Sequence, residues 1–166
     1  LSAEYGIGDG ETAFGGTSGA APMVSGAAAL VIQKFPGITP PEDKARLMNT
    51  AETNIGINPV GLPGVLAPIS RIGGGEVRVD KAIATSTAAW DAKDLTGSLS
   101  FGYNALTGSK TFLKPVVVRN YGSSARTYTI TPNFRYADDA ASGAVSVKAP
   151  ASITVPANGS KSFNVQ

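Results

Sequence analysis

The chain has 166 residues, a formal net charge of +2, no cysteine and no histidine. It therefore cannot form disulfides, and it lacks thiolate and imidazole, the usual ligands of transition metals. The small and dispersed charge argues against a nucleic-acid or membrane-surface partner, and no uninterrupted apolar run is long enough to span a bilayer.

The first predicted element is a buried helix that follows Ser18 and runs to about Phe35. Its residues are apolar or small on every side, which is typical of a helix inside a core. Pro22 is expected near the helix start, where a missing N–H costs little. Ser18 then lies at the helix N-terminus, where free N–H groups could stabilise an oxyanion. Composition alone favours a simpler interpretation, that Ser18 is an N-cap serine.

The stretch from Gly16 to Gly26 resembles, without a gap, the segment that carries the nucleophilic serine of subtilisin-like serine proteases (subtilases). The resemblance implies a serine-type endopeptidase that cleaves peptide bonds through an acyl-enzyme at Ser18, with the Ser18 N–H as an oxyanion donor. It also implies that Gly16, Thr17 and Gly19 bind substrate. Gly19 stands where the family often has methionine, so substrate preference there is expected to differ.

The catalytic aspartate, histidine and oxyanion asparagine of this family lie upstream of the serine. A serine hydroxyl is a weak nucleophile until a base takes its proton, and this chain has no imidazole. We therefore expect the chain to be the C-terminal part of a catalytic domain, inactive alone, with the upstream part of the same domain as its partner.

A second helix is predicted to begin at Thr39, because Thr39 and Glu42 have capping-box spacing and two prolines occupy the first turn. Residues 55–68 are rich in Gly, Pro and Asn and are predicted to form a loop. Residues 73–82 resemble the glycine-rich turn and short helix that close the subtilase domain. Residues 1–92 are accordingly expected to be an α/β unit, the C-terminal fragment of a three-layer subtilisin-like domain.

Residues 93–166 are predicted to be an all-β accessory domain. Alternating patterns predict short strands, which favour a β-sandwich, at residues 99–103, 112–119, 126–134, 144–147, 153–155 and 162–165. The segments 116–122 and 149–156 resemble the fibronectin-III-like domain of large bacterial subtilases. We expect this part to be the more independent folding unit, and residues 1 to about 90 to be poorly soluble alone.

No cofactor and no metal ion is expected. Asp138 and Asp139 could join a calcium site only with further oxygen ligands, and a solvated loop pair is the favoured interpretation. The family resemblance implies a polypeptide substrate and a secreted or cell-envelope location in a bacterium. The alternative is a non-catalytic binding or structural fragment of a secreted or cell-surface protein.

Overall fold

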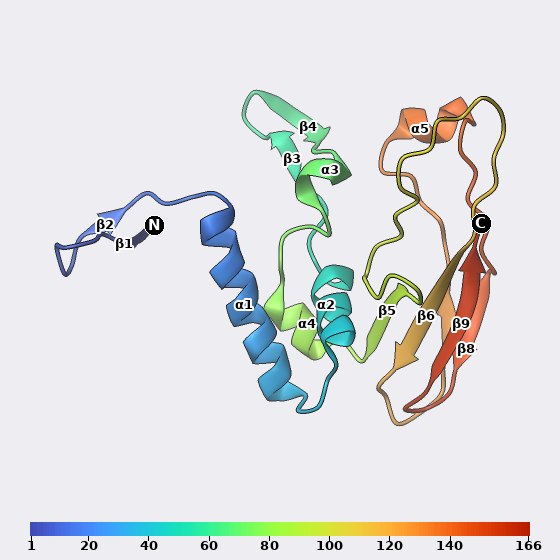
Figure 1. Cartoon of the computed structure of the whole chain (residues 1–166), viewed down its shortest axis with the longest axis horizontal. Coiled ribbons are helices and arrows are strands. Elements are labelled where there is room, and N and C mark those ends of the chain that lie inside the picture. Colours follow the sequence, from blue (N-terminus) through green and yellow to red (C-terminus); the bar gives the residue numbers. More distant parts are fainter.

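The computed structural model describes residues 1–166 as helices joined to small antiparallel sheets (Figure 1). The elements are β1 Ser2–Ala3, β2 Glu11–Thr12, α1 Thr17–Lys34, α2 Pro40–Asn49, β3 Gly56–Asn58, β4 Leu62–Leu66, α3 Ile69–Ile72, α4 Val79–Ala84, β5 Thr87–Asp91, β6 Lys114–Asn120, β7 Arg126–Thr129, α5 Ala137–Ser142, β8 Ser152–Val155 and β9 Ser160–Val165. The predicted mixture of helices and sheets is confirmed. Every strand pair is antiparallel, so the chain contains no parallel sheet.

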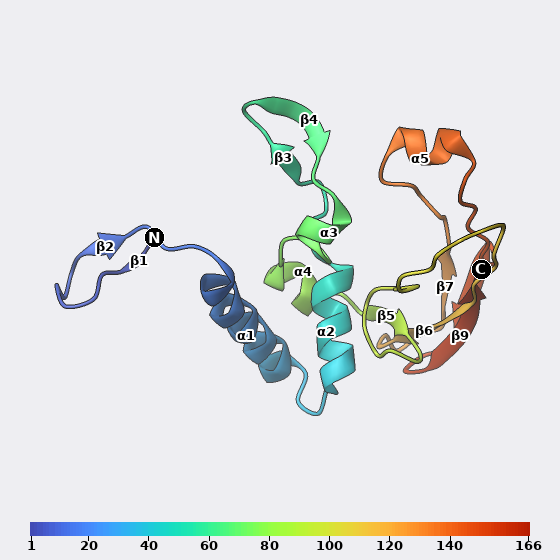
Figure 2. The same ribbon diagram turned by 45° about the horizontal axis from the view of Figure 1, so that its top comes forward.

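Helix α1 has the predicted extent but not the predicted burial. Only Ala27 and Val31 are buried, against Leu47 of α2 and Ala82 of α4. Met23, by contrast, is 70% exposed, because α2 and α4 cover one side of the C-terminal half of the helix and leave the rest open. Both views show the N-terminal end of α1 pointing away from α2 and α4, toward the β1–β2 hairpin (Figures 1 and 2).

Pro22 does not lie in the first turn of α1, as the sequence suggested, but in the second. A proline there removes the N–H that would donate to the carbonyl of Ser18 four residues earlier. Gly16 precedes the helix as its N-cap residue, so the helix begins one residue before Ser18. The serine is therefore inside the first turn and is not the N-cap residue.

Helix α2 begins as predicted. One carboxylate oxygen of Glu42 accepts the Thr39 N–H at 3.1 Å and the Thr39 hydroxyl at 2.6 Å, which closes the first turn. The following segment, predicted as a loop, forms the β3–β4 hairpin instead. In the turn of this hairpin the Asn58 side chain accepts the N–H of Gly61 at 2.9 Å. The turn residues are therefore where the sequence predicts them, but the pairing of β3 with β4 on either side of the turn was not predicted.

The C-terminal part contains two small sheets. Strands β5, β6 and β9 form one sheet, in that order, and β7 pairs with β8. The two sheets meet over a cluster of four buried residues, Val116, Val118, Ile153 and Val155. Strand β5 lies before the domain boundary expected at residue 92, yet pairs with β6 along its whole length.

Two predicted strands are absent from this part. Residues 99–103 are irregular, because Gly102 takes a positive φ of 66° and Asn104 donates to the carbonyl of Phe101 at 2.8 Å. Residues 144–147 are also irregular and follow helix α5, which ends at Gly143 in the left-handed region. Four of the six predicted strands remain, β6 to β9, and the fibronectin-III-like assignment stays a prediction.

Candidate active site

The chain turns sharply at Gly16 before it enters α1. Gly16 has φ 97° and ψ −177°, a conformation that is essentially restricted to glycine. Its carbonyl accepts the N–H groups of Gly19 at 3.0 Å and Ala20 at 3.1 Å, which fixes the first turn of the helix. This corner places Ser18 as the second residue of α1.

The Ser18 side chain is exposed, and its hydroxyl makes no hydrogen bond within the chain. The N–H groups of Thr17 and Ser18 have no intrahelical acceptor, because they lie in the first turn. These donors and the positive end of the helix dipole could stabilise a negative oxygen beside the hydroxyl. The corner therefore presents an unbonded hydroxyl beside free N–H donors, and the chain has no histidine that could act on it as a base.

An open depression of about 430 Å³ lies beside this corner. Two of the three predicted substrate-binding residues, Gly16 and Gly19, line it, whereas Thr17 and Ser18 do not. Phe14 and Met23 also line it, although neither was predicted as a site residue. A Cβ at Gly19 would lie 3.0 Å from the Phe14 ring, so glycine allows the ring to rest on the first turn.

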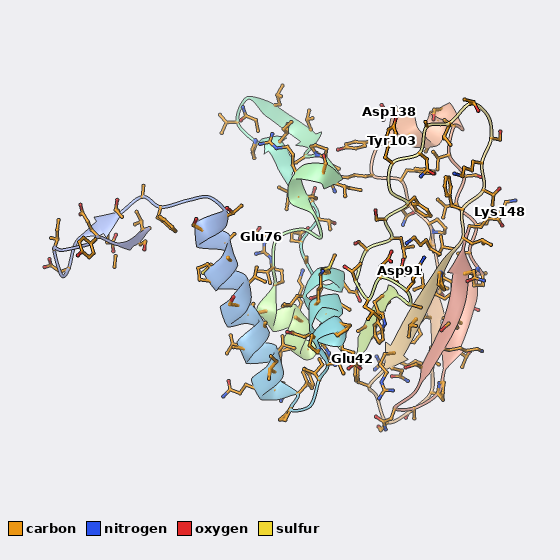
Figure 3. The ribbon with its side chains drawn as sticks, in the orientation of Figure 1. Glu42, Glu76, Asp91, Tyr103, Asp138 and Lys148 are labelled. Atoms are coloured by element: carbon orange, nitrogen blue, oxygen red, sulfur yellow. The ribbon has the colours of Figure 1, made fainter.

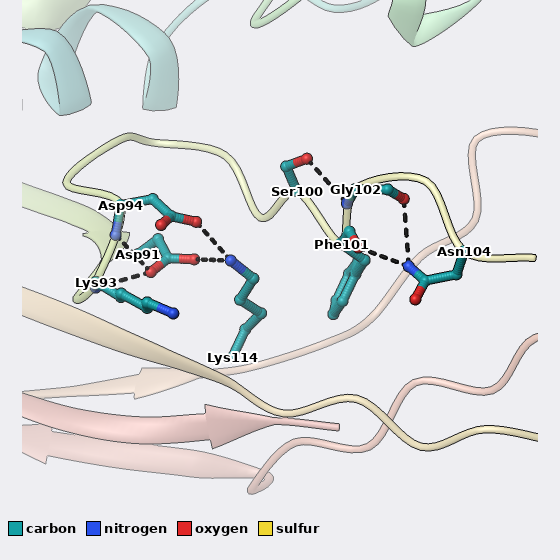
Figure 4. A network of polar contacts seen from close by, with 8 residues as sticks. All are labelled: Asp91, Lys93, Asp94, Ser100, Phe101, Gly102, Asn104 and Lys114. Atoms are coloured by element: carbon teal, nitrogen blue, oxygen red, sulfur yellow. Dashed lines mark hydrogen bonds and ion pairs between the residues drawn. The ribbon is translucent and has the colours of Figure 1, made fainter.

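The carboxylates with shifted pKa values lie outside α1; two of them, Glu42 and Asp91, are labelled in Figure 3. Asp91, at the end of β5, is fully buried and accepts the N–H groups of Asp94 at 3.0 Å and Lys93 at 2.8 Å. Its other oxygen lies 3.0 Å from the ammonium of Lys114 (Figure 4). These contacts, the Asp94 N–H foremost, lower the pKa of Asp91. Asp91 thus fixes a turn and is not placed to act on Ser18.

Asp138 and Asp139 lie in the first turn of α5, where both are exposed and the Asp139 N–H donates to Asp138 at 3.1 Å. The fold brings together no group of three or more acidic side chains suited to a metal ion. No helix combines the length and the hydropathy that a membrane crossing needs.

The sequence profile of the subtilase family matches residues 6–103, more than half of the chain. The match begins in the β1–β2 hairpin, contains the Gly16 corner and Ser18, and includes β5. It ends before β6, so strands β6 to β9 lie outside it. No curated relative matches the sequence.

Proposed function

Because the chain belongs to the subtilase family, we propose that Ser18 is the nucleophile of a serine-type endopeptidase acting on polypeptides. The observation that carries the proposal is the exposed hydroxyl in the first turn of α1, after the Gly16 corner and inside the family match. A serine held at such a corner presents its oxygen to a substrate on one side and to a base on the other.

In this reaction the Ser18 oxygen attacks the carbonyl carbon of a peptide bond and its proton passes to a base. The carbonyl oxygen becomes an oxyanion, which the Ser18 N–H helps to stabilise. The leaving amine takes the proton from the protonated base, and water then hydrolyses the acyl-enzyme. Because the chain contains no histidine, an imidazole base must come from polypeptide outside these 166 residues, and the chain alone is inactive.

The substrate is proposed to lie over the depression beside the corner, against Gly16, Thr17 and Gly19. Glycines let an extended peptide approach the backbone closely. The upstream part of the same catalytic domain is the proposed partner that supplies aspartate, histidine and asparagine. The family further favours a secreted or cell-envelope enzyme of a bacterium, with residues 93–166 as an accessory fibronectin-III-like domain.

One observation favours a second candidate function. The Ser18 hydroxyl has no hydrogen-bond partner in the chain, and no histidine is available to it. A protein that retained this arrangement even when complete would be a non-catalytic binding or structural member of the family.

A fluorophosphonate that reacts only with activated serines tests the proposal. We expect the complete translation product of the gene to be labelled at Ser18, and the 166-residue chain to remain unlabelled. Ser18→Ala should abolish labelling of the complete product. Ser25→Ala is the matched control, because the Ser25 hydroxyl lies on the same helix and donates to the Ala21 carbonyl at 2.9 Å. Labelling of the 166-residue chain would contradict the need for an external base, and an unlabelled complete product would favour the non-catalytic function.

A further inference from the structure

We propose that the C-terminal sheets are an integral part of the fold of the subtilase region, held on its helices by two arginine contacts, and not a module tethered to it. We call these contacts the Arg46 stack and the Arg135 clamp. The proposal does not depend on catalysis. It runs against the expectation that residues 93–166 fold independently.

The Arg46 stack joins α1, α2 and the end of β6. Arg46 of α2 is fully buried, and its guanidinium lies between the rings of Phe35 and Tyr121, 4.0 Å and 4.2 Å from their centroids. Its Nη1 also donates to the carbonyls of Ala82 at 3.1 Å and Thr85 at 2.7 Å. A buried cation is strongly unfavourable without such partners. Loss of Tyr121 would open one face of this cation to solvent.

A second contact at the same place connects Tyr121 to the start of α2. The Tyr121 hydroxyl donates to Glu42 at 2.8 Å, on the carboxylate oxygen that Thr39 leaves free. Burial and this carboxylate both raise the pKa of Tyr121, so the phenol stays protonated and remains a donor. Glu42 therefore links the cap of α2 to the C-terminal sheets.

In the Arg135 clamp the arginine belongs to the C-terminal part and its acceptors lie beside the β3–β4 hairpin. Arg135 donates to the carbonyl of Ala67 at 2.9 Å and to that of Thr53 at 2.8 Å, with a longer contact of 3.4 Å to Ile55. These carbonyls lie on the two sides of the hairpin. A planar guanidinium can hold several acceptors at fixed angles, so the clamp fixes the hairpin as well as attaching it.

Strand pairing also joins the family region to the C-terminal part. Strand β5 lies inside the family match and pairs with β6, which lies outside it. In addition, the N–H of Ala89 on β5 donates to Asn49 of α2 at 2.7 Å. The family match ends in the irregular segment between β5 and β6, so a single sheet combines a strand from inside the match with strands from outside it. An independent module would instead be joined to its neighbour by a linker that few contacts cross.

The test is hydrogen exchange of the full 166-residue chain, read by mass spectrometry over α2 and the β3–β4 hairpin. Arg135→Gln should speed exchange of the hairpin amides about tenfold, because the docked hairpin would open more often. Arg78→Gln is the matched control, since Arg78 forms only a local ion pair with Glu76 at 2.8 Å. Arg78→Gln should leave hairpin exchange unchanged.

A second pair of conservative variants tests the Arg46 stack. Tyr121→Phe removes the bond to Glu42, and Tyr128→Phe removes a bond of equal length, 2.8 Å, to Thr87 of β5, which lies within the C-terminal sheets. We expect Tyr121→Phe to speed exchange in α2 severalfold, and Tyr128→Phe to leave α2 unchanged. If Arg135→Gln leaves the hairpin at wild-type exchange and Tyr121→Phe does the same for α2, the sheets are a tethered module and the proposal is wrong.

Discussion

At residue 16 the backbone needs a conformation that side chains disfavour. Open space surrounds this glycine, with no atom within 4 Å of where a Cβ would stand. The substitution Gly16→Ala therefore adds backbone strain without a clash, of about 1–3 kcal/mol. Because its carbonyl accepts from Gly19 and Ala20, the strain acts on the turn that carries Ser18.

We predict that Gly16→Ala speeds amide exchange at Gly19 and Ala20 by roughly 5- to 150-fold, the ratio that corresponds to this strain. Gly15→Ala is the control, because Gly15 also has open space around it but does not have a positive φ. Amide-resolved hydrogen exchange by NMR measures both. Equal exchange in the two variants would mean that the corner carries no strain.

The sequence alone makes Ser18 the candidate nucleophile, because both its motif and its place near the start of a helix are local features. Contacts between distant residues were not predictable in this way. Nothing in the sequence near Asp91 indicates Lys114 as its partner, and nothing near Arg46 indicates Tyr121. Such pairs depend on how the sheets pack against the helices. The spacing of apolar residues along the sequence predicts helices and strands, but it does not predict how they pack together.

At the scale of elements, α1 is the clearest case of a pattern that predicts a helix but not its surroundings. A helix that is apolar on every side gives no indication of which side is covered. Here Val31 is fully buried, while Met23, Val24, Leu30 and Ile32 are all about half exposed or more. The exposed residues form an apolar surface that water solvates poorly.

We predict opposite outcomes for substitutions on the two sides of α1. Val31→Ala should lower the free energy of unfolding by roughly 1–3 kcal/mol, since it removes buried methyl groups. Met23→Lys should change that free energy by less than about 0.5 kcal/mol and raise the solubility of the chain. Urea titration and the saturation concentration measure these effects. If Met23→Lys lowered the free energy of unfolding as much as Val31→Ala does, the side of α1 that carries Met23 would be buried in solution.

The whole molecule is held together by few buried groups. Only 15 of 166 residues are buried, and eight of them form two separate apolar clusters of four residues each, one among the helices and one between the sheets. Small cores leave a narrow margin of stability, so polar contacts contribute a larger share than in a well-packed domain. The acidic side chains with shifted pKa values determine how the contribution of the polar contacts to stability changes with pH.

The directions of these shifts are not all the same. Backbone hydrogen bonds lower the pKa values of Asp91 and Glu52, and hydrogen bonds from Thr39 and Tyr121 outweigh burial to lower that of Glu42. Burial instead raises the pKa of Asp43, although Arg46 opposes the shift. A carboxylate whose pKa is lowered in the folded state stabilises the fold at pH values above its ordinary pKa. This stabilisation is lost as the pH falls through the lowered pKa. A carboxylate with a raised pKa has the opposite effect. Protonation of Asp91, Glu52 and Glu42 therefore favours unfolding in acid, whereas protonation of Asp43 opposes it.

We therefore predict that the thermal midpoint falls as the pH drops from about 5 toward 2, the range in which carboxylates with lowered pKa values become protonated. Asp91→Asn should lower the midpoint at neutral pH, because Lys114 loses its buried anion, and should flatten the acid fall. Asp9→Asn, at an exposed position in the N-terminal hairpin, should leave the profile unchanged. Thermal unfolding followed by circular dichroism across this range decides the matter. An Asp91→Asn profile parallel to that of the wild type would mean that the turn at the end of β5 does not depend on the charge.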